Sequence, residues 1–561
     1  MVGTTDRRSS IWTSERIRVP HHVAVRSPRL AKRKRRIRGP AAFSRAGFFV
    51  STASLATFRC KTQTIDSVFI RGGDVGTRPN APIFLTIGAV IRDREGAARI
   101  RSARYAAHAV SLLGGSMVRR AYRQRSLVEV LLPDGDKLWD STLRQIDTLL
   151  DDDVLVDRVA EALARRHPQS RRRGRLGTPA TVVLRMLVLK HLSDWSFDEC
   201  EREVRGSLVY RAFCRIDGER VPDAKTLIRL ARLLDEPVLK DVLARLVALG
   251  RKHRVIRGRR LRVDTTVVET NIHYPTDATL LADGVRVLTR GLRRIGEKVR
   301  ERTRSVARRV FEIAQRSRSA GHRVPAGVRA RSQAKMKVLY QGLMRITRTV
   351  MRQAESAVAR ARGKRPAGHL ATTVDLVRHV LAQTRARVLR GDTHYPGKVV
   401  SLFEPHTDII RKGKLTKPTE FGRLVKIQEA EAQFITDYAV CERRQSEQAL
   451  WGPALDRHIE LFDGAPQLAV ADGGFASATN ERAARERGVR HVVLPRQPRE
   501  TRSRGDRMAL RWRTGSEGRI SALKRRHGLR RCRYRGESGM QRWVGLGVIA
   551  NNLLVLGRAG P

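Results

Sequence analysis

The stretch LRVDTTVVE, from Leu261 to Glu269, marks a change in the chain, because the segments before it have helical spacing. Valine and threonine dominate the stretch, and β-branched side chains favour strands. Asp264 lies in its middle, flanked by apolar and β-branched neighbours. We therefore expect a strand that carries a carboxylate into a sheet.

A second strand is expected from Gln467 to Ala471, where a short apolar run ends directly at Asp472. Open α/β sheets place their sites at the carboxyl ends of strands. Gly473 and Gly474 come next, and residues without side chains leave room for a backbone or a phosphate to come close. Asp472 is therefore a candidate site residue like Asp264.

The remaining elements of this part of the chain follow from hydrophobic spacing. Strands are expected over 399–403, 434–440 and 491–494, and helices over 445–461, 478–487 and 514–527, the last being the final helix. Strands followed by alternating strands and helices predict an α/β fold with a mixed sheet. This catalytic domain would comprise 256–279 and 391–561.

Two further regions have helical spacing. Over 280–390, apolar residues recur three and four apart, which predicts long amphipathic helices inserted between the first two strands. Their outer faces are dense in arginine, and such faces are either simply solvated or follow a phosphate backbone. Over 117–255, Asp140 is expected to cap one helix and Asp223 to open another short helix. An all-helical, helix-turn-helix-like DNA-binding domain suits this pattern, as does any small helical bundle.

Residues 1–116 keep little helix or strand periodicity and contain a basic run from Lys32 to Arg36. Periodic sequence starts just after Met117. We expect either that Met117 is the true start, with 1–116 disordered or a spurious upstream extension, or that these residues form a basic arm that binds DNA.

The charge balance points to a polyanionic partner. The 561 residues include 113 Lys and Arg against 55 Asp and Glu, a formal net charge of +58. Nucleic acid is the first candidate and an anionic membrane the second. No apolar span of about 18 residues is present, so we expect no membrane segment. A coding bias towards arginine is the alternative cause of the high positive charge.

The five scattered cysteines fit neither a disulfide framework nor a zinc ribbon and favour a reducing cytoplasm.

Asp264, Asp472 and Glu517 form the candidate metal site. Carboxylates brought together repel unless a cation joins them, and oxygen-only ligation suits Mg²⁺ or Mn²⁺. Two such ions can activate an attacking oxygen and stabilise the leaving oxygen of a phosphodiester. Each acid also has a structural interpretation: an edge-strand acid at Asp264, a turn former at Asp472, and a first-turn helix acid at Glu517.

Arg513, Glu517 and Lys524 recur at helical spacing and share one helical face. Cations that flank a carboxylate in this way can bind phosphates, and the alternative is a pair of weak, solvated ion pairs. Arg519, in the same helix, is also expected to contact DNA.

These residues resemble the signature of the DDE transposases of bacterial insertion sequences, Y-x-x-R-x-x-x-E-x-x-x-x-x-x-K. Arg513, Glu517 and Lys524 match in register, and Leu510 replaces the tyrosine. The Asp264 and Asp472 blocks resemble the first two acids of the family. The strings over 269–277 and 530–534 look like the ISNCY-type branch. The resemblance covers about 123–556.

The resemblance implies an RNase-H-like catalytic domain in which Asp264, Asp472 and Glu517 hold two divalent ions, Mg²⁺ or Mn²⁺. It implies metal-dependent cleavage at the element's terminal repeats, followed by strand transfer into target DNA. The partner would be double-stranded DNA, bound by a homodimer or larger assembly. The location would be the bacterial cytoplasm, on the nucleoid.

Other polar residues are weaker candidates. Asn271 and His273 follow the first strand closely and are expected either to support the metal ligands or to satisfy loop backbone. Glu269 lies an odd number of residues from Asp264, so it faces the other side of the strand. Glu537 is the runner-up for Glu517, in what reads as a loop bounded by glycines.

Three other functions remain open. A non-enzymatic basic nucleic-acid-binding protein would explain the charge but would leave the apolar-flanked acids as coincidence. An inactive transposase relic would keep the fold, and a different metal-dependent nuclease would cut DNA without joining it. Metal-dependent nicking separates the first two from the enzymes.

Overall fold

The computed structural model describes residues 59–60, 63–72, 83–92, 98–107, 119–121, 139–167, 169, 176–216, 218–299, 303–320, 324–361, 365–411, 418–441, 445–495 and 503–559. The chain divides into two compact units, Met1–Val110 and Ser111–Pro561.

The first unit contains an antiparallel sheet in the order β1-β2-β3-β4. Its strands are β1 (Arg59–Cys60), β2 (Gln63–Gly72), β3 (Ile83–Arg92) and β4 (Ala98–Ala107). The expectation that 1–116 is disordered or a spurious upstream extension stays a prediction. β3 reads IFLTIGAVIR, so strand propensity is present although the apolar residues do not alternate. The basic run at 32–36 lies outside the described residues, and the start at Met117 stays a prediction.

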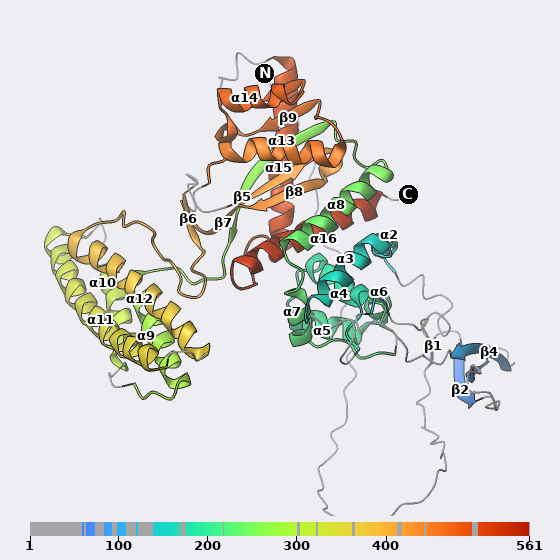
Figure 1. Cartoon of the computed structure of the whole chain (residues 1–561), viewed down its shortest axis with the longest axis horizontal. Helices are drawn as coiled ribbons and strands as arrows, with labels where there is room; N and C mark the ends of the chain where they lie inside the picture. The colour runs from blue at the N-terminus through green and yellow to red at the C-terminus, as the bar shows by residue number, and fades with distance from the viewer. Residues whose placement is uncertain are drawn as a thin grey trace, which may run out of the picture. The chain divides into compact units, whose positions relative to one another are not determined.

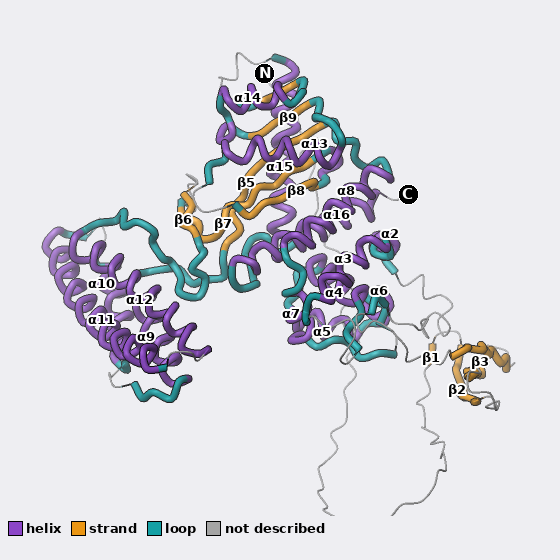
Figure 2. Tube along the Cα trace, in the orientation of Figure 1, coloured by secondary structure: helices purple, strands orange, loops and turns teal. Residues whose placement is uncertain are grey.

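The second unit has an α/β fold with a mixed sheet (Figures 1 and 2). The central strand β5 (Arg260–Glu269) pairs in parallel with β9 (Leu468–Ala471), and β9 pairs in parallel with β10 (His491–Val493). On its other side β5 pairs with the antiparallel strand β7 (Thr419–Glu429). Both β8 (Ile435–Val440) and β6 (Asp408–Arg411) pair with β7, along different parts of its length. The mixed α/β class predicted from the sequence is confirmed.

Helices cover both faces of this sheet. Leu261 and Val263 of β5 pack in one cluster with α13 (Trp451–Phe462) and α14 (Ala478–Glu486). Val268 of the same strand packs in another with α15 (Arg504–Arg526) and α16 (Glu537–Ala559). Because successive side chains of a strand point to opposite faces, these clusters lie on opposite sides of the sheet. Asp264 and Val268 share the side of α15 and α16.

Helices precede the sheet along the chain. Their bounds are α2 (Ser141–Leu149), α3 (Asp153–Ala164), α4 (Ala180–Leu192), α5 (Phe197–Gly206), α6 (Leu208–Phe213), α7 (Ala224–Ala231) and α8 (Glu236–Lys252). Asp140 caps α2 through Leu143 N–H, as predicted, and Asp223 caps α7 through Thr226 N–H at the start expected for that helix. Within the described ranges, no helix combines the length and apolarity needed to cross a membrane.

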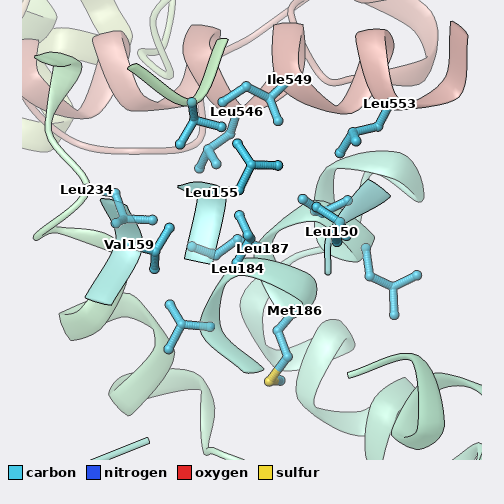
Figure 3. Close-up of a cluster of buried hydrophobic side chains, with 14 of the residues drawn as sticks. Leu150, Leu155, Val159, Leu184, Met186, Leu187, Leu234, Leu546, Ile549 and Leu553 are labelled. Carbon is cyan, nitrogen blue, oxygen red and sulfur yellow. The ribbon is translucent and has the colours of Figure 1, made fainter. Parts of the chain in front are cut away.

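Helix α16 contributes to two hydrophobic clusters. Leu546, Ile549 and Leu553 point into the core of α2 to α8, as Figure 3 shows. Trp543 and Val548 of the same helix pack under the sheet beside strands β7 and β8. One helix therefore belongs both to the core of the preceding helices and to the core of the sheet.

A separate helical bundle lies between β5 and β6 along the chain (Figure 1). It comprises α9 (Asp277–Arg294), α10 (Ser305–Arg318), α11 (Ala326–Arg360) and α12 (Arg365–Arg390). The bundle has its own core, in which Leu288, Leu343, Val350 and Val377 are buried. This is the position in the chain at which amphipathic helices were expected.

Two expected elements differ in the structure, and the last helix was not expected. Residues 399–403 form no strand, because the amide side chain of Gln383 bonds both the N–H and the carbonyl of Val399 at 3.0 Å. α15 begins at Arg504 rather than at Thr514. The hydroxyl of Ser503 caps this earlier start by accepting a hydrogen bond from Asp506 N–H. The final helix of the described chain is α16, which the sequence analysis missed.

Candidate active site

Asp264 and Asp472 lie side by side on neighbouring strands. β5 and β9 are parallel, and Val263 is the register partner of Ala471. Each aspartate is the next residue along its strand, and Asp472 keeps an extended backbone. Side chains at paired positions of adjacent strands point to the same face, and such strands are about 4.8 Å apart. The sheet therefore brings together the first two acids predicted from the sequence.

Asp264 is buried and held by two hydrogen bonds. Its Oδ1 accepts from the backbone N–H of Thr265 at 2.7 Å. Its Oδ2 accepts from the hydroxyl of Ser516 at 2.6 Å, and Ser516 is buried in α15. Each carboxylate oxygen has two lone pairs, so both keep capacity for a cation.

Asp472 is half-buried at the start of a short 3-10 turn formed by Gly473–Phe475. Its Oδ1 accepts from the N–H of Gly474 at 3.0 Å. The pKa of Asp472 lies above its ordinary value, chiefly because burial disfavours the charged form and also because the negative charges of Glu447 and Asp264 are near. The Gly474 N–H and the charge of Arg513 oppose this rise.

Glu447 is an acid of this site that the sequence analysis missed. Its carboxylate accepts a hydrogen bond from the hydroxyl of Thr265, the residue after Asp264. Its Oε2 lies so close to the backbone of Gly474 that a Cβ there would overlap it. Glu447 precedes the 3-10 turn Gln448–Leu450 that leads into α13, whereas the sequence placed it in the helix expected over 445–461, where an acid has no distinguishing signal.

Glu517 follows Ser516 directly in α15, and its side chain is exposed. It lies well inside the helix, not in the first turn as expected. Arg513, one turn earlier and half-buried, acts electrostatically on Asp472. Lys524 is half-buried further along the same helix. α15 thus carries all three residues of the signature, and Arg513 lies near the aspartates.

Arg519 is engaged within the protein. Its guanidinium donates to Oδ1 of Asn551 at 2.8 Å and to the side chain of Gln433. Burial lowers its pKa, and the charge of Glu429 opposes that change. A DNA contact by Arg519 stays a prediction, but its present contacts dock α15 onto its neighbours.

A buried ion pair fixes α15 on the sheet. Arg262 of β5 pairs with Glu429 of β7, and both side chains are nearly inaccessible. Arg262 also donates to the carbonyl of Trp512 at 2.7 Å, and its guanidinium lies over the Trp512 ring. A Cβ at Gly515 would lie 2.6 Å from Nη1 of Arg262, so glycine permits this approach. Burial raises the pKa of Glu429 to about 7, although Arg262 opposes the rise.

The structure places the weaker candidates away from the two aspartates. His273 lies 3.4 Å from Oδ2 of Asp283 in α9, measured from Nε2, and Asn271 is exposed beyond the end of β5. Glu269 pairs with Arg531 at 3.3 Å. Glu537 is the first residue of α16, not part of a loop, and pairs with Arg423.

The arrangement offers carboxylate oxygens on one face of a sheet, with a cation and two glycines beside them. Within the described residues, no three His, Cys, Asp or Glu side chains form a group that could hold a metal ion. The pair Asp264 and Asp472 is therefore the part of the predicted triad that the structure assembles. The negative charge of Glu447 acts on Asp472, and Glu517 directly follows Ser516, which bonds Asp264.

Two family models match the chain. Residues 131–233, which include α2 to α7, match a Transposase domain (DUF772). Residues 479–556, which include Arg513, Glu517 and Lys524, match a Transposase DDE domain. No curated protein and no solved structure matches the chain. These two stretches of the chain are thus similar to transposase domains, and the mixed α/β sheet is compatible with a DDE transposase fold.

Proposed function

We propose that this chain catalyses metal-dependent cleavage and strand transfer of an insertion sequence, with Asp264, Asp472 and Glu517 as its metal-binding acids. The observation that carries the proposal is the registered pair Asp264 and Asp472 on adjacent parallel strands, beneath the helix that carries Glu517. Two carboxylates held on one face, near Arg513, suit chemistry on a phosphodiester.

The sheet order supports an RNase-H-like catalytic domain. Taken in chain order, β5, β7 and β8 form an antiparallel run, and β9 and β10 extend the sheet in parallel on the other side of β5. The proposed domain joins 256–279 to 391–561, with the bundle as an insertion. Within the DDE transposases, the strings over 269–277 and 530–534 favour the ISNCY-type branch.

The donor set fits a divalent cation. Asp264 and Asp472 supply only oxygen ligands, as Mg²⁺ and Mn²⁺ prefer. A cation would also relieve the repulsion that helps to raise the pKa of Asp472. We propose that these two residues hold the ions and that Glu517 completes the set. When bound, the ions would supply Lewis-acid stabilisation of the phosphodiester oxygens.

The protein's own residues would position DNA at this pair. Ser516 and Thr265 N–H fix both oxygens of Asp264, which keeps its carboxylate in one orientation. Gly473 and Gly474 are both exposed, and the carboxylate of Glu447 occupies the space beside Gly474. Arg513 and Lys524 would bind phosphates on either side of Glu517.

The reaction would have two steps. Water attacks the phosphodiester at the element's terminal repeat, the P–O3′ bond breaks, and a free 3′-OH remains. That hydroxyl then attacks a phosphodiester of target DNA in line, and the target 3′ oxygen leaves.

The proposed partners are the element's ends and target DNA, bound by a homodimer or larger assembly on the bacterial nucleoid. The α2 to α8 helices are the proposed end-binding region.

The test is nicking of supercoiled plasmid by the purified full-length chain with Mg²⁺ or Mn²⁺, and with EDTA. Asp264→Asn, Asp472→Asn and Glu517→Gln are each expected to abolish nicking but to keep affinity for a DNA duplex. Asp463→Asn is the control, because Asp463 is an exposed acid paired with Arg251. It should nick like the wild type.

The outcomes separate the competing functions. Full nicking by any one of the three variants would remove that residue from the site. DNA binding by the wild type without metal-dependent nicking would favour a non-enzymatic binder or an inactive relic. Nicking without strand transfer to a second duplex would favour a different nuclease.

A further inference from the structure

Helix α11 carries a stripe of cations along its outer side. The stripe comprises Arg331, Lys335, Arg345, Arg348 and Arg352, and all five side chains are exposed. At about 100° per residue they fall within roughly 140° of the helix circumference. Leu343, Ile346 and Val350 point the other way, into the bundle core.

The bundle's acids do not neutralise this stripe. Every described acid in the bundle already has an ion-pair partner outside the stripe: Asp277–Arg387, Asp283–Arg286, Glu297–Arg360, Glu312–Arg308, Glu355–Arg378 and Asp375–Arg378. Among the described residues, none of the five stripe cations forms a salt bridge, although Arg331 donates to the carbonyl of Gly327. Five like charges on one exposed face create a positive potential that attracts a polyanion.

We propose that the α11 stripe binds the sugar–phosphate backbone of double-stranded DNA without reading its sequence. From Arg331 to Arg352 the helix rises about 32 Å, close to the roughly 34–36 Å of one duplex turn. Arginine and lysine heads spread over this length can contact several phosphates, and no base contact is required. The inference rests on the proposed function only in taking DNA as the partner, because it needs no cleavage chemistry.

The chemistry of the stripe favours duplex DNA over other polyanions. An amphipathic helix on a membrane inserts an apolar face, but the main apolar face of α11 is buried in the bundle core. Single strands are bound by stacking on aromatic side chains, and the one aromatic residue of α11, Tyr340, is half-buried.

The test compares two triple variants of the full chain. Lys335→Gln, Arg345→Gln and Arg352→Gln together remove three of the five positive charges of the stripe. Arg286→Gln, Arg308→Gln and Arg378→Gln together remove the same charge from cations of the same bundle that are already paired. Binding to a labelled duplex of about 30 base pairs is followed by fluorescence anisotropy in EDTA over a salt series. EDTA keeps the result independent of catalysis at Asp264.

The stripe variant should bind at least about tenfold more weakly at low salt, equally so for unrelated sequences. The slope of log affinity against log salt concentration should be smaller in magnitude than the wild-type slope by about 2 to 3. The control triple should keep the wild-type slope. Equal slopes for all three proteins, or equal losses in both triples, would overturn the proposal.

Circular dichroism of both triples checks that the bundle still folds. Vesicles containing phosphatidylserine test the membrane alternative. If the stripe triple lost vesicle binding but kept duplex binding, the partner would be a membrane and the proposal would fail. Nicking by the wild type tests the proposed function separately, so each idea can fail alone.

Discussion

The hydroxyl of Ser516 donates to Oδ2 of Asp264 at 2.6 Å, although 252 residues separate the two along the chain. The bond joins the middle of α15 to the central strand of the sheet. It thereby sets the position of the next residue, Glu517, relative to the aspartate pair. Four predictions follow the contacts that hold this arrangement.

Ser516→Ala should destabilise the protein by about 1–3 kcal/mol, because a buried carboxylate loses a hydrogen-bond donor. Chemical unfolding of the full chain measures the change. Ser521→Ala is the control on the same helix, since Ser521 is only half-buried. An equal, small effect of both variants would mean that the Ser516 bond contributes nothing to the docking of α15.

Gly515→Ala should also destabilise the protein by about 1–3 kcal/mol, because the new methyl group would meet the guanidinium of Arg262. That guanidinium cannot move freely, since it binds Glu429 and the Trp512 carbonyl. Gly518→Ala is the matched control in the same helix. Nothing lies within 4 Å of a Cβ there, so alanine should stabilise the helix by about 0.5–1 kcal/mol. Opposite signs in thermal unfolding are the expected result, and matching signs would refute the packing argument.

Gly474→Ala should displace the carboxylate of Glu447 while leaving overall stability within about 1 kcal/mol, because the overlapping atom is the end of a flexible side chain. We expect weaker Mn²⁺ binding by titration, similar to the effect of Glu447→Gln. The double variant should then add little to either single change. Fully additive losses would show that the two residues act separately. Gly464→Ala, at a site where a Cβ meets nothing within 4 Å, is the control.

Glu429 should make stability depend on pH. Burial raises its pKa to about 7, against an ordinary value of 4.5. Between these values the folded state keeps a proton that the unfolded state has released. The free energy of unfolding therefore falls as pH rises through this window and levels off above about pH 7.

The Glu429→Gln variant cannot titrate at this position. The wild type minus variant difference in unfolding free energy should fall by on the order of 1–3 kcal/mol from pH 5 to 7.5. Taking this difference cancels the pH-dependent contributions of the other acids, because both proteins contain them. A difference that stays constant or rises across this range would contradict the burial effect.

Strands that read as apolar runs were predictable from the sequence. The expected strands at 261–269, 467–471 and 491–494 correspond to β5, β9 and β10. β7 was missed because buried charges interrupt its apolar pattern. Arg423, Lys426 and Glu429 are all buried there, each next to an opposite charge contributed by another element. Sequence spacing does not reveal such distant partners.

The site was predictable only where its residues stand in a local apolar pattern. Asp264 and Asp472 each stand at a strand in an apolar setting, and that setting singled them out. Ser516 and Glu447 reach the site through tertiary contacts with Asp264 and Thr265. A serine within a helix and a glutamate in a loop have no local pattern that separates them from surface residues. Assigning them to the site required the packing of α15 and the loop before α13.

The sharing of α16 between two cores has a consequence for synthesis on the ribosome. Leu546, Ile549 and Leu553 complete a core whose other members lie mostly within 146–256. Those earlier helices leave the ribosome hundreds of residues before α16 is made. Until then, the apolar surface that α16 covers is exposed to solvent or bound by another protein. Domains usually fold as they emerge, and exposed apolar surface promotes aggregation. We therefore expect nascent chains that stop before α16 to depend on chaperones, which pull-down from stalled ribosomes would detect.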